Sequence, residues 1–150
     1  MSDNTRWGAD LRLLDNLLRQ NDLDVGEDLF VTERLETGRI DLATVVADDN
    51  LKQALLLRFL TRRGELESLG HPAYGSRLFD LLGERNTLAN RNRAKLYVLE
   101  ALAMEPRVAE VLRVTVETNR AEPTQIDISV SLRPIYADTA LNLVFPFFLE

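Results

Sequence analysis

The chain has 150 residues, of which 45% are hydrophobic and 28% charged, with a net charge of −6 and no cysteine. This composition is typical of a soluble globular domain, and the lack of cysteine excludes disulfides and thiolate metal sites. No apolar run approaches the roughly 18 residues that a membrane span needs, and the first ten residues do not resemble a secretory signal. We therefore expect no membrane association.

The charge is unevenly distributed. Residues 1–50 carry 5 basic and 12 acidic residues, residues 51–95 carry 9 and 4, and residues 96–150 carry 4 and 8. A basic middle inside an acidic chain favours a complementary protein surface over a nucleic-acid groove, which requires a strongly basic domain with interleaved aromatics. Solvated helix faces would have the same composition. We expect no nucleic-acid partner.

Residues 1–47 are predicted to form an extended N-terminal segment with short strands. Residues 7–14 alternate apolar and charged side chains, as a strand with one covered face does. Residues 29–31 and 40–46 are predicted as further extended pieces around a turn at Thr37 and Gly38.

The acidic residues 21–28 surround Gly26 and are similar in composition to a calcium loop. In such a loop glycine takes the sixth position, and oxygen ligands take the first, third and fifth. Here those positions hold Asn21, Leu23 and Val25, and two of the three cannot bind a cation. We therefore predict no metal site, and nothing else in the sequence indicates a cofactor.

A first helix is predicted to begin at Asp48 and to end before Gly64. Asn50 is expected near its N-cap, with Gln53 placed to reach back to it. Two arginines in the last turn and a glycine after it are typical of a helix C-terminus.

A loop is predicted over residues 65–75, followed by a short helix that Ser76 caps and Gly83 ends. His71 and Tyr74 lie in this loop. We interpret the histidine as a locally bonded loop residue and the tyrosine as a packing anchor.

A second helix is predicted to begin at residue 86 or 87 and to end at about Met104. One apolar stripe at helical spacing runs along it: Ala94, Tyr97, Val98, Ala101 and Leu102. Further apolar residues cover much of the opposite side: Leu96, Leu99 and Ala103. Because a helix that is apolar nearly all round is buried, we expect this one to lie between two layers.

The next position on the apolar stripe is Glu105, and Pro106 and Arg107 follow it. Proline disfavours the α conformation of the residue before it, so the helix should stop here. An inward carboxylate is costly unless it is paired, and arginine can bind it through two hydrogen bonds. We therefore predict an ion pair between Glu105 and Arg107 at a structural junction.

After Arg107 the hydrophobic period changes from 3.6 to 2. Two segments alternate apolar and polar side chains, with these apolar members: Leu112, Val114, Val116, Ile126, Ile128, Val130 and Leu132. This pattern predicts an antiparallel pair of strands with a loop over residues 119–125.

A third strand is predicted near the end of the chain, and it is apolar on both faces. It comprises Leu141, Asn142, Leu143, Val144, Phe145, Pro146, Phe147 and Phe148. Because proline cannot donate a ladder hydrogen bond, the strand belongs at a sheet edge or a bulge. Such an edge can accept a strand from a partner, or helices of the same chain can cover it.

These elements predict an α+β fold in which helices pack on a small antiparallel sheet. We expect one domain over residues 1–150. Within it, residues 1–47 form the N-terminal segment, 48–107 the helical part and 108–150 the sheet.

A catalytic role is the alternative to a structural one. A muramidase needs two carboxyl groups facing each other across a cleft, one of them with a raised pKa. Glu100 and Glu105 are five residues apart on one helix and point in different directions, and Arg107 would lower the pKa of Glu105. With one histidine, no cysteine and no nucleophile motif, nucleophilic catalysis is not predicted. We predict that the protein is not an enzyme, with a muramidase as the alternative.

Several ordered stretches of the chain resemble the gene-25-like family of phage baseplate wedge proteins, which includes subunits of type VI secretion and other contractile injection systems. The similar stretches are 50–55, 60–66, His71–Leu78, Glu105–Val108 and Asn142–Phe147. The block from Gly70 to Ser76, the Glu-Pro-Arg block that ends a helix and the closing strand carry the resemblance together. The first 47 residues match only loosely.

The resemblance implies a sheath initiator that docks on the baseplate wedge and templates sheath assembly by strand addition. It assigns the wedge-docking motif to Glu105, Pro106 and Arg107, and the sheath contact to residues 141–148. The implied partners are the sheath protein, the wedge proteins and the inner tube or hub, with several copies, six in the family, around the tube. It also implies assembly in the bacterial cytoplasm and incorporation into a phage tail or a contractile injection particle, without specifying which machine.

Overall fold

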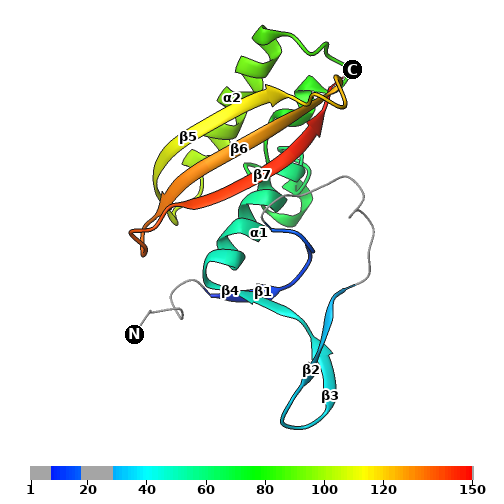
Figure 1. Ribbon diagram of the computed structural model, residues 1–150, viewed down its shortest axis with the longest axis vertical. Helices are drawn as coiled ribbons and strands as arrows, with labels where there is room; N and C mark the ends of the chain where they lie inside the picture. Colours follow the sequence, from blue (N-terminus) through cyan, green and yellow to red (C-terminus); the bar gives the residue numbers. More distant parts are fainter. Residues whose placement is uncertain (1–7, 18–28, 150) are drawn as a thin grey trace.

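The computed structural model describes residues 8–17 and 29–149 and has the mixed α+β architecture expected from the sequence (Figure 1). In chain order its elements are β1 (Ala9–Leu11), β2 (Val31–Arg34), β3 (Arg39–Leu42), β4 (Thr44–Val46), α1 (Ala47–Leu60), the 3₁₀ turns η3 (Glu67–Leu69) and η4 (Leu78–Leu81), α2 (Leu88–Ala103), β5 (Val108–Thr118), β6 (Gln125–Pro134) and β7 (Leu141–Phe148). The acidic stretch at residues 21–28 and Trp7 lie outside the described residues.

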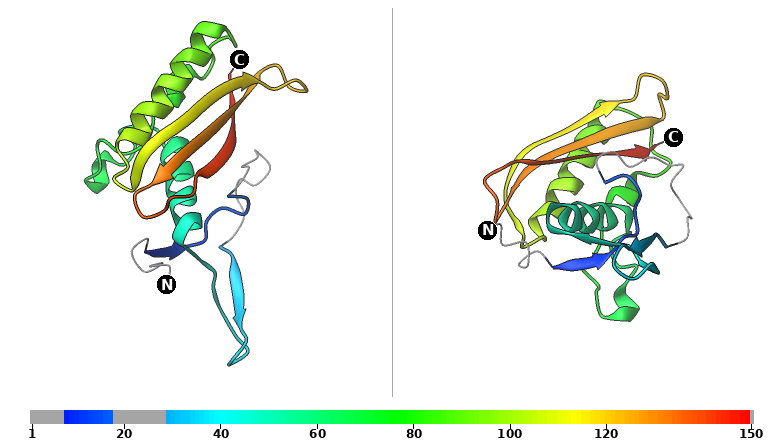
Figure 2. Two further views of the ribbon diagram at one scale, coloured as in Figure 1. Left: turned by 60° about the vertical axis from the view of Figure 1, so that its left-hand side comes forward. Right: turned by 60° about the horizontal axis from the view of Figure 1, so that its bottom comes forward.

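The three C-terminal strands form an antiparallel sheet in the order β5-β6-β7. The helices lie on one face of this sheet, with α2 against β5 and α1 against β7 (Figure 2). The inward side chains of β6 are those that the alternation predicted, and all are buried: Ile126, Ile128, Val130 and Leu132. The opposite face of the sheet is exposed or half-buried, as expected for an antiparallel sheet with one wet face.

Aromatic side chains join β7 to the elements beneath it. The ring of Phe145 stacks on that of Phe59 in α1, with centroids 4.9 Å apart. Phe147 meets Phe79 of η4 edge to face at 6.0 Å. Aromatic pairs of this kind contribute about 0.5–1.5 kcal/mol beyond the area they bury. The inward face of β7 is therefore part of the core.

The predicted alternation in β5 is wrong at its start. Leu112 was expected to face the core, but its side chain is 49% exposed. The pairing with β6 shifts between Val108 and Glu110 and again between Val111 and Arg113, because the strand carries an extra residue at each place. A bulge of this kind reverses the side to which the following residues point. Val111 instead packs against the core before the second bulge, and Val114 does so after it.

Helix α2 has its predicted boundaries and its predicted core stripe. Thr87 is the N-cap and accepts a hydrogen bond from the Asn90 backbone N–H. All five residues of the stripe are buried. The expectation that α2 lies between two layers is wrong, because Leu96 is 51% exposed and Ala103 is exposed as well. Only one face of the helix packs on the sheet, and the other faces solvent.

The capping arrangement predicted for α1 is also wrong. The helix begins at Ala47, and Val46 is its N-cap without a side-chain hydrogen bond. Gln53 reaches the N-terminal segment instead: its Oε1 accepts from the Leu13 and Leu14 backbone N–H groups, and its Nε2 donates to the Leu11 carbonyl. A buried amide thus satisfies backbone groups at the end of β1 and just after it.

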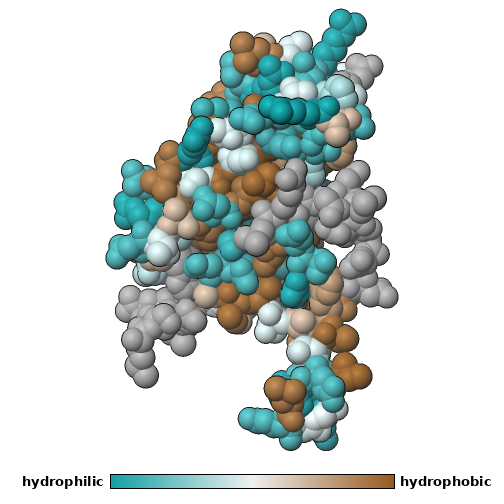
Figure 3. All heavy atoms as spheres, in the orientation of Figure 1, coloured by the Kyte–Doolittle hydropathy of each residue, from teal (hydrophilic) through white to brown (hydrophobic). Residues whose placement is uncertain are grey.

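Two small two-stranded units precede α1. β1 pairs with β4, and β2 pairs with β3 as a hairpin that projects away from the helices (Figure 1). The hairpin turn includes Thr37 and Gly38, as predicted. Figure 3 shows apolar atoms on this projection, and Leu35 at its tip is fully exposed. Within the described residues, neither helix is long and apolar enough to cross a bilayer.

Candidate functional site

The Glu-Pro-Arg junction lies where α2 ends and β5 begins. Met104 closes the helix, and the Glu105 backbone N–H still donates to the Leu102 carbonyl. The Glu105 side chain is only 5% exposed, as the inward stripe predicted. Pro106 is exposed, and β5 starts two residues later. The sequence therefore places a carboxylate under the end of the sheet.

Glu105 binds Arg107 through both of its oxygens. The Arg107 Nε donates to Oε1 at 2.6 Å, and its Nη2 donates to Oε2 at 3.3 Å. The Arg107 backbone N–H also donates to Oε1, at 3.3 Å. This two-pronged pairing, predicted from the sequence, fixes the direction in which the chain leaves the helix.

A second arginine, which was not predicted from the sequence, contributes to the site. The Arg58 Nη2 lies 3.5 Å from Glu105 Oε2, and the Arg58 side chain is only 12% exposed. Its Nε is buried without a hydrogen-bond partner. Arg58 lies seven positions after Leu51, on the buried side of α1. A charged residue on the apolar side of this helix is the sequence signal that could have identified Arg58.

The two arginines determine the protonation of Glu105. Burial acts to raise the pKa of this carboxyl group. The hydrogen bonds and positive charge of Arg107, together with the charge of Arg58, outweigh that effect and lower the pKa below its ordinary value of 4.5. Glu105 is therefore ionised at neutral pH, inside a cluster whose net charge is positive.

We predict that Glu105 makes stability depend on pH in the acidic range. Folding lowers the pKa of Glu105. Its contribution to the free energy of unfolding is therefore fully present above pH 4.5 and is lost as the pH falls through the folded-state pKa. Urea denaturation of the wild type and of Glu105→Gln, measured from pH 7 downward, should show a difference in unfolding free energy that shrinks below pH 4.5. A difference that stays constant down to pH 2.5 would contradict this assignment.

The loop from Gly70 to Ser76 is bonded to the end of α1. The Ser76 backbone N–H donates to the Thr61 carbonyl, and its Oγ donates to the Phe59 carbonyl at 2.9 Å. Gly75 has a φ of +99° and passes so close that an added Cβ would lie 2.6 Å from the Thr61 carbonyl oxygen. Glycine is required here for its conformation and for its size.

This attachment places Tyr74 over the ion-pair cluster. The Arg58 guanidinium lies 4.7 Å from the centre of the Tyr74 ring, which is a cation–π contact. Burial raises the pKa of the Tyr74 hydroxyl, so the tyrosine stays neutral. Tyr74, predicted from the sequence to be a packing anchor, packs on a charged residue, Arg58.

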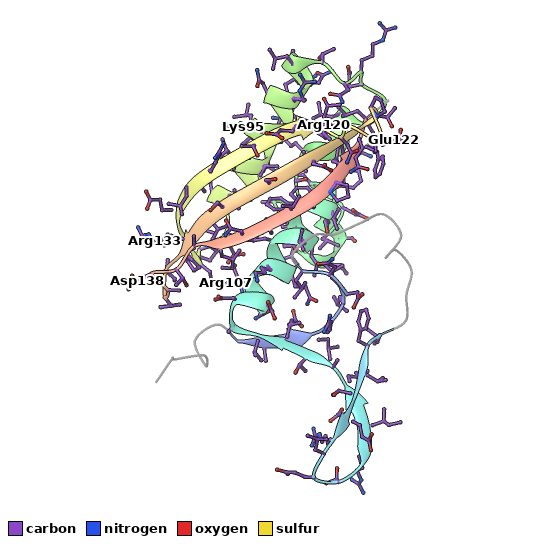
Figure 4. The ribbon with its side chains drawn as sticks, in the orientation of Figure 1. Lys95, Arg107, Arg120, Glu122, Arg133 and Asp138 are labelled. Atoms are coloured by element: carbon purple, nitrogen blue, oxygen red, sulfur yellow. The ribbon has the colours of Figure 1, made fainter. Side chains whose placement is uncertain are left out.

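The cluster opens onto a hollow of about 280 Å³. It is lined by Arg58, the residues from Gly70 to Tyr74, and Met104. His71 is exposed on its rim. Figure 4 shows Arg107 at the same end of the sheet as Arg133 and Asp138, opposite the end with Arg120 and Glu122. The Glu-Pro-Arg motif and this hollow thus mark one end of the sheet.

The second predicted site, residues 141–148, is β7, and it forms one edge of the sheet. Among the strands of the described residues it pairs with β6 alone, and the register is regular along its whole length. The Leu149 backbone N–H donates to the Thr124 carbonyl, so the odd-numbered residues of β7 bond to β6. In an antiparallel pair, alternate residues point away from the partner. The backbones of Asn142, Val144, Pro146 and Phe148 therefore face the open edge.

The carboxylates considered for catalysis are bound by arginines. Glu100 lies 4.0 Å from Arg63 and 3.9 Å from Arg77, and Glu105 has the lowered pKa described above. Glu105 is therefore not a carboxyl group held protonated for acid catalysis. Among the described residues, no group of three or more histidine, aspartate or glutamate side chains is placed to hold a metal ion.

A solved structure shares the fold of this chain. A crystal structure of a Geobacter sulfurreducens protein, described as a candidate tail lysozyme, superimposes with a TM-score of 0.57 and 28% identity, over 65% of this chain and 86% of that one. No curated protein is similar enough to count as a match.

The sequence also matches the family of baseplate wedge protein gp25 over residues 39–135. The matched part runs from β3 to the end of β6 and includes Glu105, Pro106 and Arg107, while β7 lies beyond it. The matched residues make up well over half of the chain. The chain therefore belongs to the gp25 family of baseplate wedge proteins.

Proposed function

We propose that this structural component of a phage-tail-type baseplate is a sheath initiator. One end of its sheet docks on the wedge, and its β7 edge accepts a strand from the sheath protein. The observation that carries the proposal is a β-strand at the sheet edge whose inner face is locked into the core. Such an edge is rigid and offers unpaired backbone groups, which are the two properties that strand addition needs.

The docking end is supported by the cluster around Glu105. Arg58 and Arg107 hold the carboxylate, and Tyr74 lies against the Arg58 guanidinium. Pro106 and Met104 remain exposed beside the hollow. A rigid, partly apolar depression with polar groups in it is typical of a protein contact. Because the cluster carries an excess positive charge, we propose that the wedge surface it meets carries an acidic group.

The sheath contact is supported by the position of β7 relative to that docking end. β7 begins at the end of the sheet that carries the motif, since Leu141 pairs with Leu132 near the end of β6, and Val108 pairs with Pro134. A subunit held at the motif would therefore present its open edge at a fixed angle to the wedge. Several copies around the tube would offer the first sheath ring a set of identical edges.

A lysozyme role is less well supported by the residues of this chain. The description of the Geobacter protein applies to that protein. In this chain the buried glutamate has a lowered pKa and two arginine partners, whereas a glycosidase acid needs a raised pKa. We propose that Glu105 holds the fold and the docking surface together.

Replacing Val144 with proline tests the sheath contact. Its backbone N–H faces the open edge, so the change should leave the ladder with β6 intact while removing a donor that an added strand would use. Val144→Thr is the matched control, because threonine keeps the backbone N–H and has nearly the shape of valine. We expect Val144→Pro to lose co-sedimentation with the sheath protein and Val144→Thr to retain it.

Wedge binding provides the second measurement. Val144 is distant from the Glu-Pro-Arg motif in the chain and lies on the edge, so both variants should still bind the wedge proteins. Val144→Pro binding the sheath as well as the wild type does would refute strand addition at this edge. Loss of wedge binding in the same variant would refute the proposal that the wedge and the sheath bind at separate parts of the sheet.

A further inference from the structure

Pro146 lies among the β7 residues that face outward. The residues whose backbones point to the open edge are Asn142, Val144, Pro146 and Phe148. Three of them present an N–H and a carbonyl, while the proline presents a carbonyl and, where the N–H would be, its Cδ. The edge therefore has one defective position, and that position is near its middle.

We propose that Pro146 prevents the free protein from pairing with a second copy of itself through β7. Two copies would meet edge to edge in an antiparallel arrangement related by a two-fold axis. In a symmetric pair, each defect occurs twice. A register with full overlap places Pro146 of each copy opposite Val144 of the other, so two hydrogen bonds are lost and two rings crowd the partner backbone.

A single strand from another protein meets the same defect only once. It can keep its hydrogen bonds at Asn142 and Val144, on the side of Pro146 nearer the Glu-Pro-Arg motif. This half of the proposal rests on the proposed sheath contact, whereas the self-pairing half does not. The proline thus weakens the binding of a partner strand by one factor. It weakens self-association by the square of that factor.

Such protection is needed because the rest of the strand favours association. Val144 and Phe148 have half-buried apolar side chains on the outer face, and the inner face is fixed in the core by Phe145. A rigid, apolar edge is the kind that aggregates when it is unprotected. Within the described residues, no backbone hydrogen bond covers the outward groups of β7.

The test is sedimentation equilibrium of the full chain carrying Pro146→Ala, over a range of concentrations. Each restored hydrogen bond contributes about tenfold in affinity, so we expect self-association about 100-fold tighter than in the wild type. Binding of the sheath protein should tighten only about tenfold. Pro123→Ala, in the exposed loop between β5 and β6, is the control for removing a proline elsewhere and should sediment as the wild type does.

A second variant ties the result to the edge. Val144→Pro combined with Pro146→Ala moves the defect by two residues along the same edge and should restore the monomer. The proposal is overturned if Pro146→Ala stays monomeric, or if it associates and the double variant does so equally. Pro146→Ala could associate as expected while neither the wild type nor this variant binds the sheath protein. In that case the proposed sheath contact fails and this inference stands.

Discussion

Replacing Glu105 with alanine is expected to lower the free energy of unfolding by about 3–5 kcal/mol, the cost of removing one partner from a buried ion pair. Arg58 would keep its charge at 12% exposure with no carboxylate beside it, and its Nε is already without a partner. Urea denaturation at pH 7 measures the change. Wedge binding should be lost as well, because Arg107 would no longer be held.

Glu100→Ala is the matched control for this prediction. Glu100 lies in α2 and, like Glu105, is a carboxylate with two arginines near it, but its side chain is 36% exposed and its ion pairs are long, at 3.9 and 4.0 Å. Exposed pairs of this kind contribute about 0–1 kcal/mol. If the two variants lose equal amounts of unfolding free energy, burial does not make the Glu105 ion pairs more stabilising than those of Glu100.

Replacing Gly75 with alanine is expected to lower the free energy of unfolding by about 3 kcal/mol or more, since conformational strain and overpacking add. Its φ of +99° disfavours any residue with a Cβ, and the new atom would lie 2.6 Å from the Thr61 carbonyl oxygen and 2.8 Å from the Arg62 carbonyl carbon. Both are backbone atoms and cannot turn aside. The loop should detach from α1, and thermal or urea unfolding should show the loss.

Gly70→Ala separates conformational strain from collision. Gly70 has a φ of +86°, and an added Cβ would meet nothing within 4 Å. Only the left-handed conformation is then penalised, by roughly 1–2 kcal/mol. If Gly75→Ala costs no more than Gly70→Ala, the close approach of the loop to α1 is not what requires glycine.

The parts of the fold that sequence could predict are those with a repeating pattern. The stripe of α2 and the alternation of β6 each repeat over several turns or residue pairs, so the buried face is determined locally. Glu105 was identifiable because it continues such a stripe. Arg58 follows from the same reasoning applied to α1, where it shares a face with Leu51.

What the sequence does not reveal is pairing across long separations. Gln53 bonds to Leu11 and Leu13, about forty positions away, while the local capping pattern pointed to Asn50. The second of the two register shifts in β5 inserts one residue without any glycine or proline to mark it, and Leu112 is therefore exposed. In both cases a tertiary contact overrides a local preference.

Residue-resolved amide hydrogen exchange at β7, with and without the sheath protein, tests the central claim most directly. In the free protein, the amides of Leu143, Phe145 and Phe147 should be protected by β6, and those of Asn142, Val144 and Phe148 should exchange quickly. Adding sheath protein should protect the second set. Outward amides that are already protected in the free protein, or that stay unprotected when sheath is bound, would contradict strand addition at this edge.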